Sequence, residues 1–228
     1  DRPNPNGGYV DGPIRKPEFK YFLAMHPIPI VHGLTVGELA NMINGEGWLG
    51  ENLICDLTVV PCEGYTHDMP YSLPVPPSPN LRSDLSIQLY PSLCLLEATT
   101  VTVGRGTEYP FEIYGHPDFP ATGFSFTPKA GYGSKDPKQE GKKCNGYHLT
   151  DKKYQRMNQL DFSFLVNANQ QLNGGLFIDR DKFFNLLAGN DVLIEQLKKG
   201  MSEDDIRASW EPKLSEFKET RKKYLIYD

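Results

Sequence analysis

The chain has 228 residues, of which 39% are hydrophobic and 23% charged, a composition typical of a globular protein that can bury a substantial core. Its formal net charge of -5 argues against a surface built to neutralise phosphates, because nucleic-acid binding needs a basic face. No stretch approaches the roughly 18 consecutive apolar residues of a membrane helix. We therefore expect one or two domains, no nucleic-acid partner and no membrane span.

The first residues, DRPNPNGG, lack both an initiator methionine and the apolar region of a signal peptide. We expect that Asp1 is not the natural start of the protein. Prolines spaced through residues 1–31 favour extended backbone and predict an irregular connector. Thr35 then predicts the start of a short amphipathic helix, with Glu38 in the capping-box position three residues later.

The middle of the chain contains a strand candidate and a second helix. Residues 57–61, LTVVP, have the composition of a buried strand. Ser83 or Asp84 can cap the helix that follows, and Pro91 most simply restarts a helical turn at its first position. Glu97 then lies where this helix ends.

The second half first predicts strands and then helices. Aromatic and β-branched residues indicate strands within residues 109–115, 124–128 and 142–150. Apolar residues with helical spacing follow, and Ser202 with the next three acidic residues is a strong helix start. Pro212 is expected to divide the last helical region, whose basic residues we interpret as a solvated face: Lys218, Arg221, Lys222 and Lys223. This order predicts an α+β fold, a small mixed sheet with flanking helices.

Known catalytic and metal-binding motifs are absent from the sequence. The five histidines never fall four residues apart on a helix or beside a cysteine at finger-like spacing, so we expect no metal site. Phosphate-loop, dinucleotide and GxSxG patterns are also missing, which leaves no support for a cofactor or a serine hydrolase. The cysteines are too few and too widely spaced for a disulfide scaffold and are interpreted as buried thiols: Cys55, Cys62, Cys94 and Cys144.

Carboxylate, arginine, histidine and asparagine side chains on loops remain, and these are typical of sugar binding and glycoside cleavage. Asp1, Arg2 and Asn4 lie in a backbone stiffened by two prolines, which indicates either a preorganised binding loop or a turn in which Asp1 pairs with Arg2 or caps backbone donors. His32 is either a binding residue or a half-buried residue that bonds the backbone. Asn80 ends a proline-rich turn and can be a simple Asx cap.

Glu97 and Arg105 flank the polar loop ATTVTVG, and two readings of them stay open. A mutual ion pair would pin the loop, although an exposed pair contributes at most about 1 kcal/mol. Alternatively, Gly104 and Gly106 let backbone donors approach a ligand, while Arg105 presents a planar fork suited to a carboxylate.

These same stretches, in order and spacing, resemble the NamZ-like family of exo-β-N-acetylmuramidases. The resemblance runs almost from end to end, and its motifs are long and irregular, which makes a chance match improbable. The matching stretches are DRPNPNGG with VDGP at 1–13, PIPIVHGLTVGELA at 27–40, DLTVVPCEGY at 56–65, PPSPNL at 76–81, LYPSLCLLEATTVTVGRGTEYPFEIYGHP at 89–117, and FKETRKKYLIY at 217–227.

The resemblance implies a glycoside hydrolase that releases N-acetylmuramic acid from the non-reducing ends of peptidoglycan fragments, which makes a peptidoglycan-derived saccharide the expected partner. It implies a Rossmann-like N-terminal domain joined to a smaller α+β domain, with substrate between them. Residues 1–50 would then be the tail of the first domain with a connector, and residues 51–228 the second. The expected site is Glu97 as catalytic residue, holding or protonating the sugar, Arg105 on the lactyl carboxylate, and Asp1, Arg2, Asn4, His32 and Asn80 facing the substrate.

One departure from the family pattern leaves open an alternative to the hydrolase function. Members of the family have an additional N-terminal α/β region with a Glu-His-Gly type motif, the expected home of the main catalytic acid, and these 228 residues do not contain it. The alternative is therefore a non-catalytic saccharide-binding or accessory domain that is inactive without that region. The substrate implies a periplasmic or secreted bacterial protein.

Overall fold

A computed structural model describes residues 1–150, 157–172 and 180–228 of the chain. The described residues combine helices with small antiparallel sheets, so the predicted α+β class is confirmed. No helix among them is long and apolar enough to cross a membrane. The helices are α1 (Val36–Gly45), α2 (Asp84–Leu93), α3 (Ser163–Gln171), α4 (Asp181–Ala188), α5 (Val192–Lys198) and α6 (Glu203–Lys222), with short 3-10 turns η1 (Pro17–Phe19) and η2 (Cys94–Ala98).

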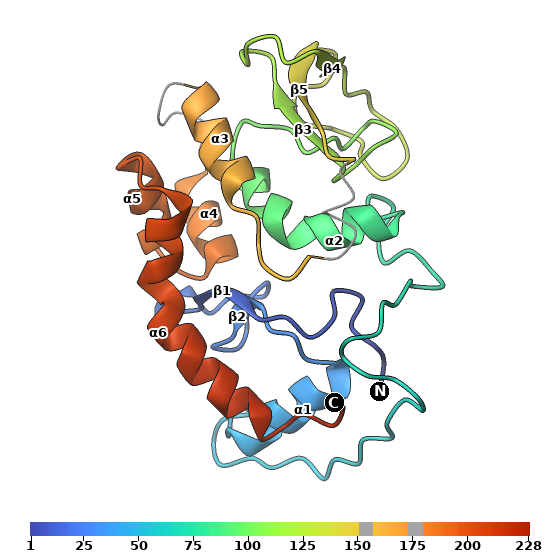
Figure 1. Cartoon of the computed structure of the whole chain (residues 1–228), viewed down its shortest axis with the longest axis vertical. Coiled ribbons are helices and arrows are strands. Elements are labelled where there is room, and N and C mark those ends of the chain that lie inside the picture. Colours follow the sequence, from blue (N-terminus) through green and yellow to red (C-terminus); the bar gives the residue numbers. More distant parts are fainter. Residues whose placement is uncertain (151–156, 173–179) are drawn as a thin grey trace.

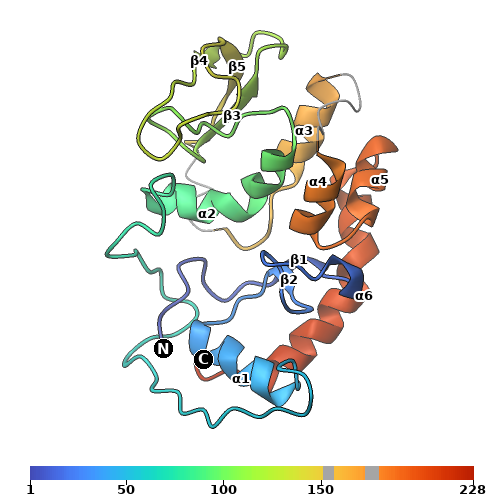
Figure 2. The same cartoon turned by 180° about the vertical axis from the view of Figure 1, so that it is seen from behind.

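The elements are arranged along the long axis of the molecule (Figure 1). One end carries the sheet of β3 (Ile113–His116), β4 (Phe124–Phe126) and β5 (Cys144–His148), and the other end carries α1. The helix α6 runs along one side, and α2 lies across the middle. The reverse view places both chain ends beside α1 (Figure 2).

The first helix starts as the sequence predicts. Thr35 Oγ1 accepts the backbone N–H of Glu38, and the Glu38 side chain accepts the N–H of Thr35, which completes the capping box. Just before this helix, β1 (Asp11–Ile14) and β2 (Pro29–Val31) form a two-stranded antiparallel ribbon. The ribbon packs against α6 through β1, and this contact joins the two ends of the sequence.

The sheet at the other end of the molecule is antiparallel throughout, in the order β3-β5-β4, so the expected mixed sheet is wrong. The strands β4 and β5 lie within the ranges predicted from aromatic and β-branched content, and β3 extends one residue beyond its predicted range, to His116. Ser83 caps α2 by accepting the N–H of Ser86, and Pro91 lies inside this helix rather than starting a new one.

The last helix also differs from its prediction, because Pro212 does not divide it. The helix α6 is continuous over 20 residues, with Ile206, Trp210, Leu214 and Phe217 buried along one face. Pro212 lies on the exposed face, where water can bond the carbonyl that loses its partner, and the buried face holds the helix together.

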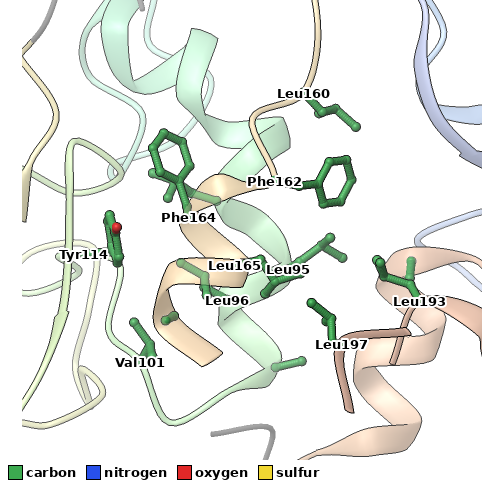
Figure 3. Packing of buried hydrophobic residues seen from close by; sticks show 14 of the residues in the cluster. Leu95, Leu96, Val101, Tyr114, Leu160, Phe162, Phe164, Leu165, Leu193 and Leu197 are labelled. Atoms are coloured by element: carbon green, nitrogen blue, oxygen red, sulfur yellow. The ribbon is translucent and has the colours of Figure 1, made fainter. Parts of the chain in front are cut away.

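The hydrophobic core lies between α2 with η2 on one side and α3 to α6 on the other (Figure 3). Leu95 and Leu96 of η2 are 1% and 0% exposed, which fixes the 3-10 turn that contains Glu97. Tyr114 of β3 packs against Phe164 of α3 with ring centroids 5.6 Å apart, so the sheet is attached to the same core.

The predicted buried strand at residues 57–61 is wrong. The described structure has no strand there, and Val60 is 73% exposed. The prediction of buried thiols holds for Cys144 but not for Cys55, which is exposed, and all four cysteines are free.

Candidate functional site

Glu97 and Arg105 contact one another directly. Arg105 Nε and Nη2 both lie 2.8 Å from Glu97 Oε1, and the side chains of Arg105 and Glu97 are 34% and 24% exposed respectively. The guanidinium also lies over the Phe111 ring, 5.0 Å from its centroid. The geometry is that of a half-buried ion pair at the end of η2, and the substrate roles expected for the two residues remain predictions.

The two glycines beside Arg105 have a structural explanation. Gly104 has φ +80° and Gly106 has φ +79°, a region that side chains rarely adopt. A Cβ at Gly104 would lie 2.6 Å from the Tyr109 carbonyl oxygen, and one at Gly106 would lie 2.5 Å from that of Lys129. The Cβ direction of each glycine is therefore filled by protein, and the approach of their backbone donors to a ligand stays a prediction.

Asp1 is tied to the start of α1 and to the end of the chain. Its Oδ1 accepts the N–H groups of Arg2 and Gly37 at 2.6 and 2.8 Å. Its Oδ2 accepts the hydroxyls of Thr35 and Tyr227, both at 2.7 Å. Its carboxylate therefore acts as an anion at a helix N-terminus, and Arg2 itself is exposed, with Nη1 donating to the Asp1 carbonyl.

The other three expected binding residues bond the backbone. Asn4 donates to the Leu34 carbonyl at 3.0 Å, and His32 Nδ1 accepts the N–H of Leu34 at 3.1 Å. Burial and the nearby positive Arg221 lower the pKa of His32 to about 4, so His32 is neutral. Asn80 is 4% exposed and donates to the Gly133 carbonyl at 2.7 Å.

A cavity of about 690 Å³, which we call the main cavity, lies beside this N-terminal network rather than at Glu97. None of the seven expected site residues lines it. Its walls come from the turn at residues 5–9, the loop at 67–72, the start of α2, residues 157–158, and residues 221–228 at the C-terminal end. The polar residues among them are Asn6, Tyr9, His67, Asp68, Tyr71, Ser72, Asp84, Gln88, Asn158, Arg221, Tyr227 and Asp228.

Glu38 does not line this cavity, but it holds two residues that do, His67 and Ile226. It is 0% exposed, and its Oε1 lies 2.9 Å from His67 Nε2 and 2.9 Å from the backbone nitrogen of Ile226, which donates to it. The hydrogen bonds from His67, Ile226 and Thr35 outweigh desolvation and lower the pKa of Glu38. Glu38 is therefore a carboxylate, and His67 Nε2 carries the proton that it shares with Glu38.

Unsatisfied polar atoms concentrate at this cavity. In the described parts of the chain, six buried side-chain nitrogen or oxygen atoms have no hydrogen-bond partner. Four of the six belong to residues that line the cavity: Asn6 Oδ1, Tyr9 OH, His67 Nδ1 and Arg221 Nε. Because buried polar groups are normally paired, this concentration indicates a site for a polar ligand.

A second hollow, of about 600 Å³, lies near the end of β3 and is lined by Thr100, His116, Pro117, Asp118, Gln139, Lys142 and Leu172. His116 Nδ1 accepts the N–H of Asp118 there at 3.1 Å, and none of the unpartnered buried atoms belongs to its lining. The described residues contain no group of three or more histidine, cysteine, aspartate or glutamate side chains that could hold a metal ion.

Sequence reasoning missed His67 altogether and placed Arg221 on the solvated face. Arg221 lies four residues after buried Phe217 and seven after buried Leu214, so it shares their face of α6. Its guanidinium donates to the carbonyls of Gly8 and Gly33 at 3.1 and 2.5 Å, which corrects that placement. Its spacing from the apolar residues was the signal available in the sequence. Glu38 was identified only as a cap.

These features define an α+β protein with a polar cavity walled by both ends of its chain. A family model described as exo-β-N-acetylmuramidase NamZ, C-terminal, matches residues 88–227, and its N-terminal counterpart matches residues 1–85. The chain therefore belongs to the NamZ family. The two matches meet at the start of α2, and cavity walls come from both: Asn6 and His67 from the first, Gln88 and Arg221 from the second.

A named relative supports the same assignment. The chain is 35% identical over 246 residues to the peptidoglycan β-N-acetylmuramidase NamZ of Bacillus subtilis strain 168, an alignment that covers 100% of this chain and 58% of that protein. The chain thus spans little more than half the length of this relative.

Two solved structures, both of DUF1343 family proteins from Bacteroides fragilis NCTC 9343, share the fold. One is 46% identical with a TM-score of 0.94, and the other is 23% identical with a TM-score of 0.79. Each alignment covers 100% of this chain and 65% of the solved chain.

Proposed function

We propose that the protein containing this chain is a glycoside hydrolase that releases N-acetylmuramic acid from the non-reducing ends of peptidoglycan fragments. The observation that carries the proposal is the end-to-end similarity to a peptidoglycan β-N-acetylmuramidase. The cavity adds physical support, because a volume of about 690 Å³ with several unpartnered polar atoms suits a saccharide.

We further propose that this cavity belongs to a substrate cleft between two domains. Its walls come from the segments matched by the N-terminal and the C-terminal family models. Because the chain spans 58% of its Bacillus relative, the first segment would be the tail of a Rossmann-like domain that is completed by residues outside this sequence. The same substrate class leads us to propose a periplasmic or secreted location, which fractionation of the source cells would test.

Glycoside cleavage needs a group that protonates the leaving oxygen and a second group that supports the oxocarbenium-like transition state. Glu97 is our candidate for holding or protonating the sugar, and any test of it must separate chemistry from the Arg105 ion pair. Glu97→Gln keeps the shape of the side chain and removes the charge. Glu219→Gln is a matched control, because Glu219 pairs with Lys222 on the exposed face of α6.

The test is turnover of a 4-nitrophenyl β-glycoside of N-acetylmuramic acid by the natural full-length protein. We expect release of nitrophenol, a large loss of kcat in Glu97→Gln, and unchanged kcat in Glu219→Gln. Saccharide binding without product release at any pH would reject the hydrolase and leave a non-catalytic binding domain. Equal activity of Glu97→Gln and the parent would remove Glu97 alone from the mechanism.

A further inference from the structure

Arg221 is a partly buried cation without an acidic partner. Its Nη2 donates to two carbonyl oxygens, those of Gly8 and Gly33, while its Nε is buried with no acceptor. Within the described ranges, no carboxylate forms a salt bridge with it. Burial lowers the pKa of Arg221, although the nearby Glu38 carboxylate opposes this effect. A guanidinium in this position is costly unless an anion pairs with it.

His67 presents a second unpartnered nitrogen on the same wall. Because its Nε2 is 2.9 Å from the buried Glu38 carboxylate, Nε2 carries the proton, and in the neutral ring Nδ1 is left as an acceptor. The His67 side chain is 9% exposed, and Nδ1 has no partner.

Gly8 links the two residues. Its carbonyl accepts from Arg221 at 3.1 Å, and a Cβ at Gly8 would lie 2.7 Å from the Cβ of His67. The missing side chain thus lets a histidine and an arginine from distant parts of the sequence pack against one residue. Both line the main cavity, as does Asn6, whose Oδ1 is also unpartnered.

This combination of groups matches one class of ligand. We propose that Arg221 binds a carboxylate of the ligand in the main cavity, while the ligand's hydroxyl or amide groups bond the cavity-lining side chains of His67 and Asn6. A planar guanidinium recognises carboxylates, and the two acceptors require donors on the same molecule. A sugar acid supplies both. Naming it as N-acetylmuramic acid, with its lactyl carboxylate, rests on the proposed function.

The test measures binding, so it does not require turnover. Isothermal titration of the natural full-length protein would compare N-acetylmuramic acid with the same sugar in which the lactyl carboxylate is an amide. We expect the acid to bind about tenfold tighter or more, the range for a hydrogen bond to a charged group. Arg221→Gln should abolish this preference. Lys222→Gln, a substitution at the neighbouring position whose lysine pairs with Glu219, should leave it unchanged.

A second measurement is needed because Arg221 also holds the Gly8 and Gly33 carbonyls, so its replacement can unfold the protein and abolish binding for that reason alone. In the unaltered protein, the Nε–H resonance of Arg221, assigned by its loss in Arg221→Lys, should shift on addition of the acid and not of the amide. No shift at saturation, or a full preference for the acid in folded Arg221→Gln, would overturn the proposal. Turnover without dependence on Arg221 would reject the carboxylate site at Arg221 and leave the proposed hydrolase activity intact. Binding that depends on Arg221 without turnover would support the carboxylate site and reject the hydrolase activity.

Discussion

The Asp1 carboxylate and the Tyr227 hydroxyl lie 2.7 Å apart, a hydrogen bond between residues separated by 226 positions in the sequence. Tyr227 also accepts the backbone N–H of Cys62 at 2.9 Å and is only 9% exposed. This one phenol therefore joins both ends of the described chain to the segment around Cys62, which comes just before the cavity-lining residues 67–72.

Tyr227→Phe should lower the free energy of unfolding by about 1 to 2 kcal/mol, because it leaves the Cys62 N–H without its acceptor and removes one of the two hydroxyl hydrogen bonds to Asp1 Oδ2. Urea denaturation followed by tryptophan fluorescence measures the change. Tyr132→Phe is the matched control, because Tyr132 is 84% exposed. Equal stability of the two variants would show that the Tyr227 hydroxyl does not hold the chain ends together.

Arg105→Ala should cost at most about 1 kcal/mol of stability, since the Glu97–Arg105 pair is partly exposed to solvent. Its effect on specificity decides whether Arg105 reads the lactyl carboxylate. That role requires kcat/KM to fall more for muramic-acid glycosides than for N-acetylglucosamine glycosides. An equal loss on both substrates would exclude Arg105 from this discrimination, and side-by-side assays with Arg221→Gln would show which arginine carries it.

His32 should make the protein less stable in mild acid. Its pKa is about 4 in the folded chain, against an ordinary value of 6.5, so the unfolded chain binds the proton first as the pH falls. The free energy of unfolding should therefore fall between about pH 6.5 and pH 4, by up to about 3 kcal/mol. The depressed pKa of Glu38 acts in the same direction but below its ordinary value of 4.5.

Urea unfolding at several pH values tests this prediction. His32→Asn keeps an acceptor for the Leu34 N–H but does not titrate, so its stability should be flatter between pH 6.5 and pH 4 than that of the parent. Parallel curves for the two proteins would assign the acid sensitivity to other groups.

The cysteines should differ sharply in their reaction with iodoacetamide. Cys55 is exposed, whereas burial raises the pKa of the Cys94 thiol to about 12 and that of Cys144 to about 11. At pH 8, mass spectrometry should find Cys55 alkylated first, and Cys94 and Cys144 modified only after urea is added. Rapid modification of Cys144 in the native protein would contradict the described packing of β5.

Local signals predicted the helices well because their cause is local. Thr35 with Glu38, and Ser202 before three acidic residues, satisfy backbone donors within a few positions, and both helices begin there. Pro212 failed as a signal because it acts locally, whereas α6 is held by buried Trp210 and Leu214 on its other face. Tertiary packing outweighs a single helix breaker on a solvent-exposed surface.

The strand predicted at residues 57–61 and the cavity show what local signals cannot predict, because both depend on residues that are distant in the sequence. Apolar and β-branched composition indicates that a segment suits burial, but it does not say whether a partner strand is within reach, and Val60 is exposed. The cavity depends on contacts such as those of Gly8 with His67 and Arg221, which join residues 59 and 213 positions apart. No window of sequence contains that information. The sequence did show which functional groups lie on loops: carboxylate, arginine and amide side chains.

The walls of the cavity include residues 5–9 near the start of the sequence and residues 221 and 225–228 near its end, so its assembly has an order in time. During synthesis, residues 5–9 leave the ribosome long before Arg221 exists to hold the carbonyls of Gly8 and Gly33. The core of α2 to α5 can condense earlier, but the cavity closes only when the end of α6 docks. A nascent chain stalled before residue 221 would thus hold much of its apolar core and no finished cavity.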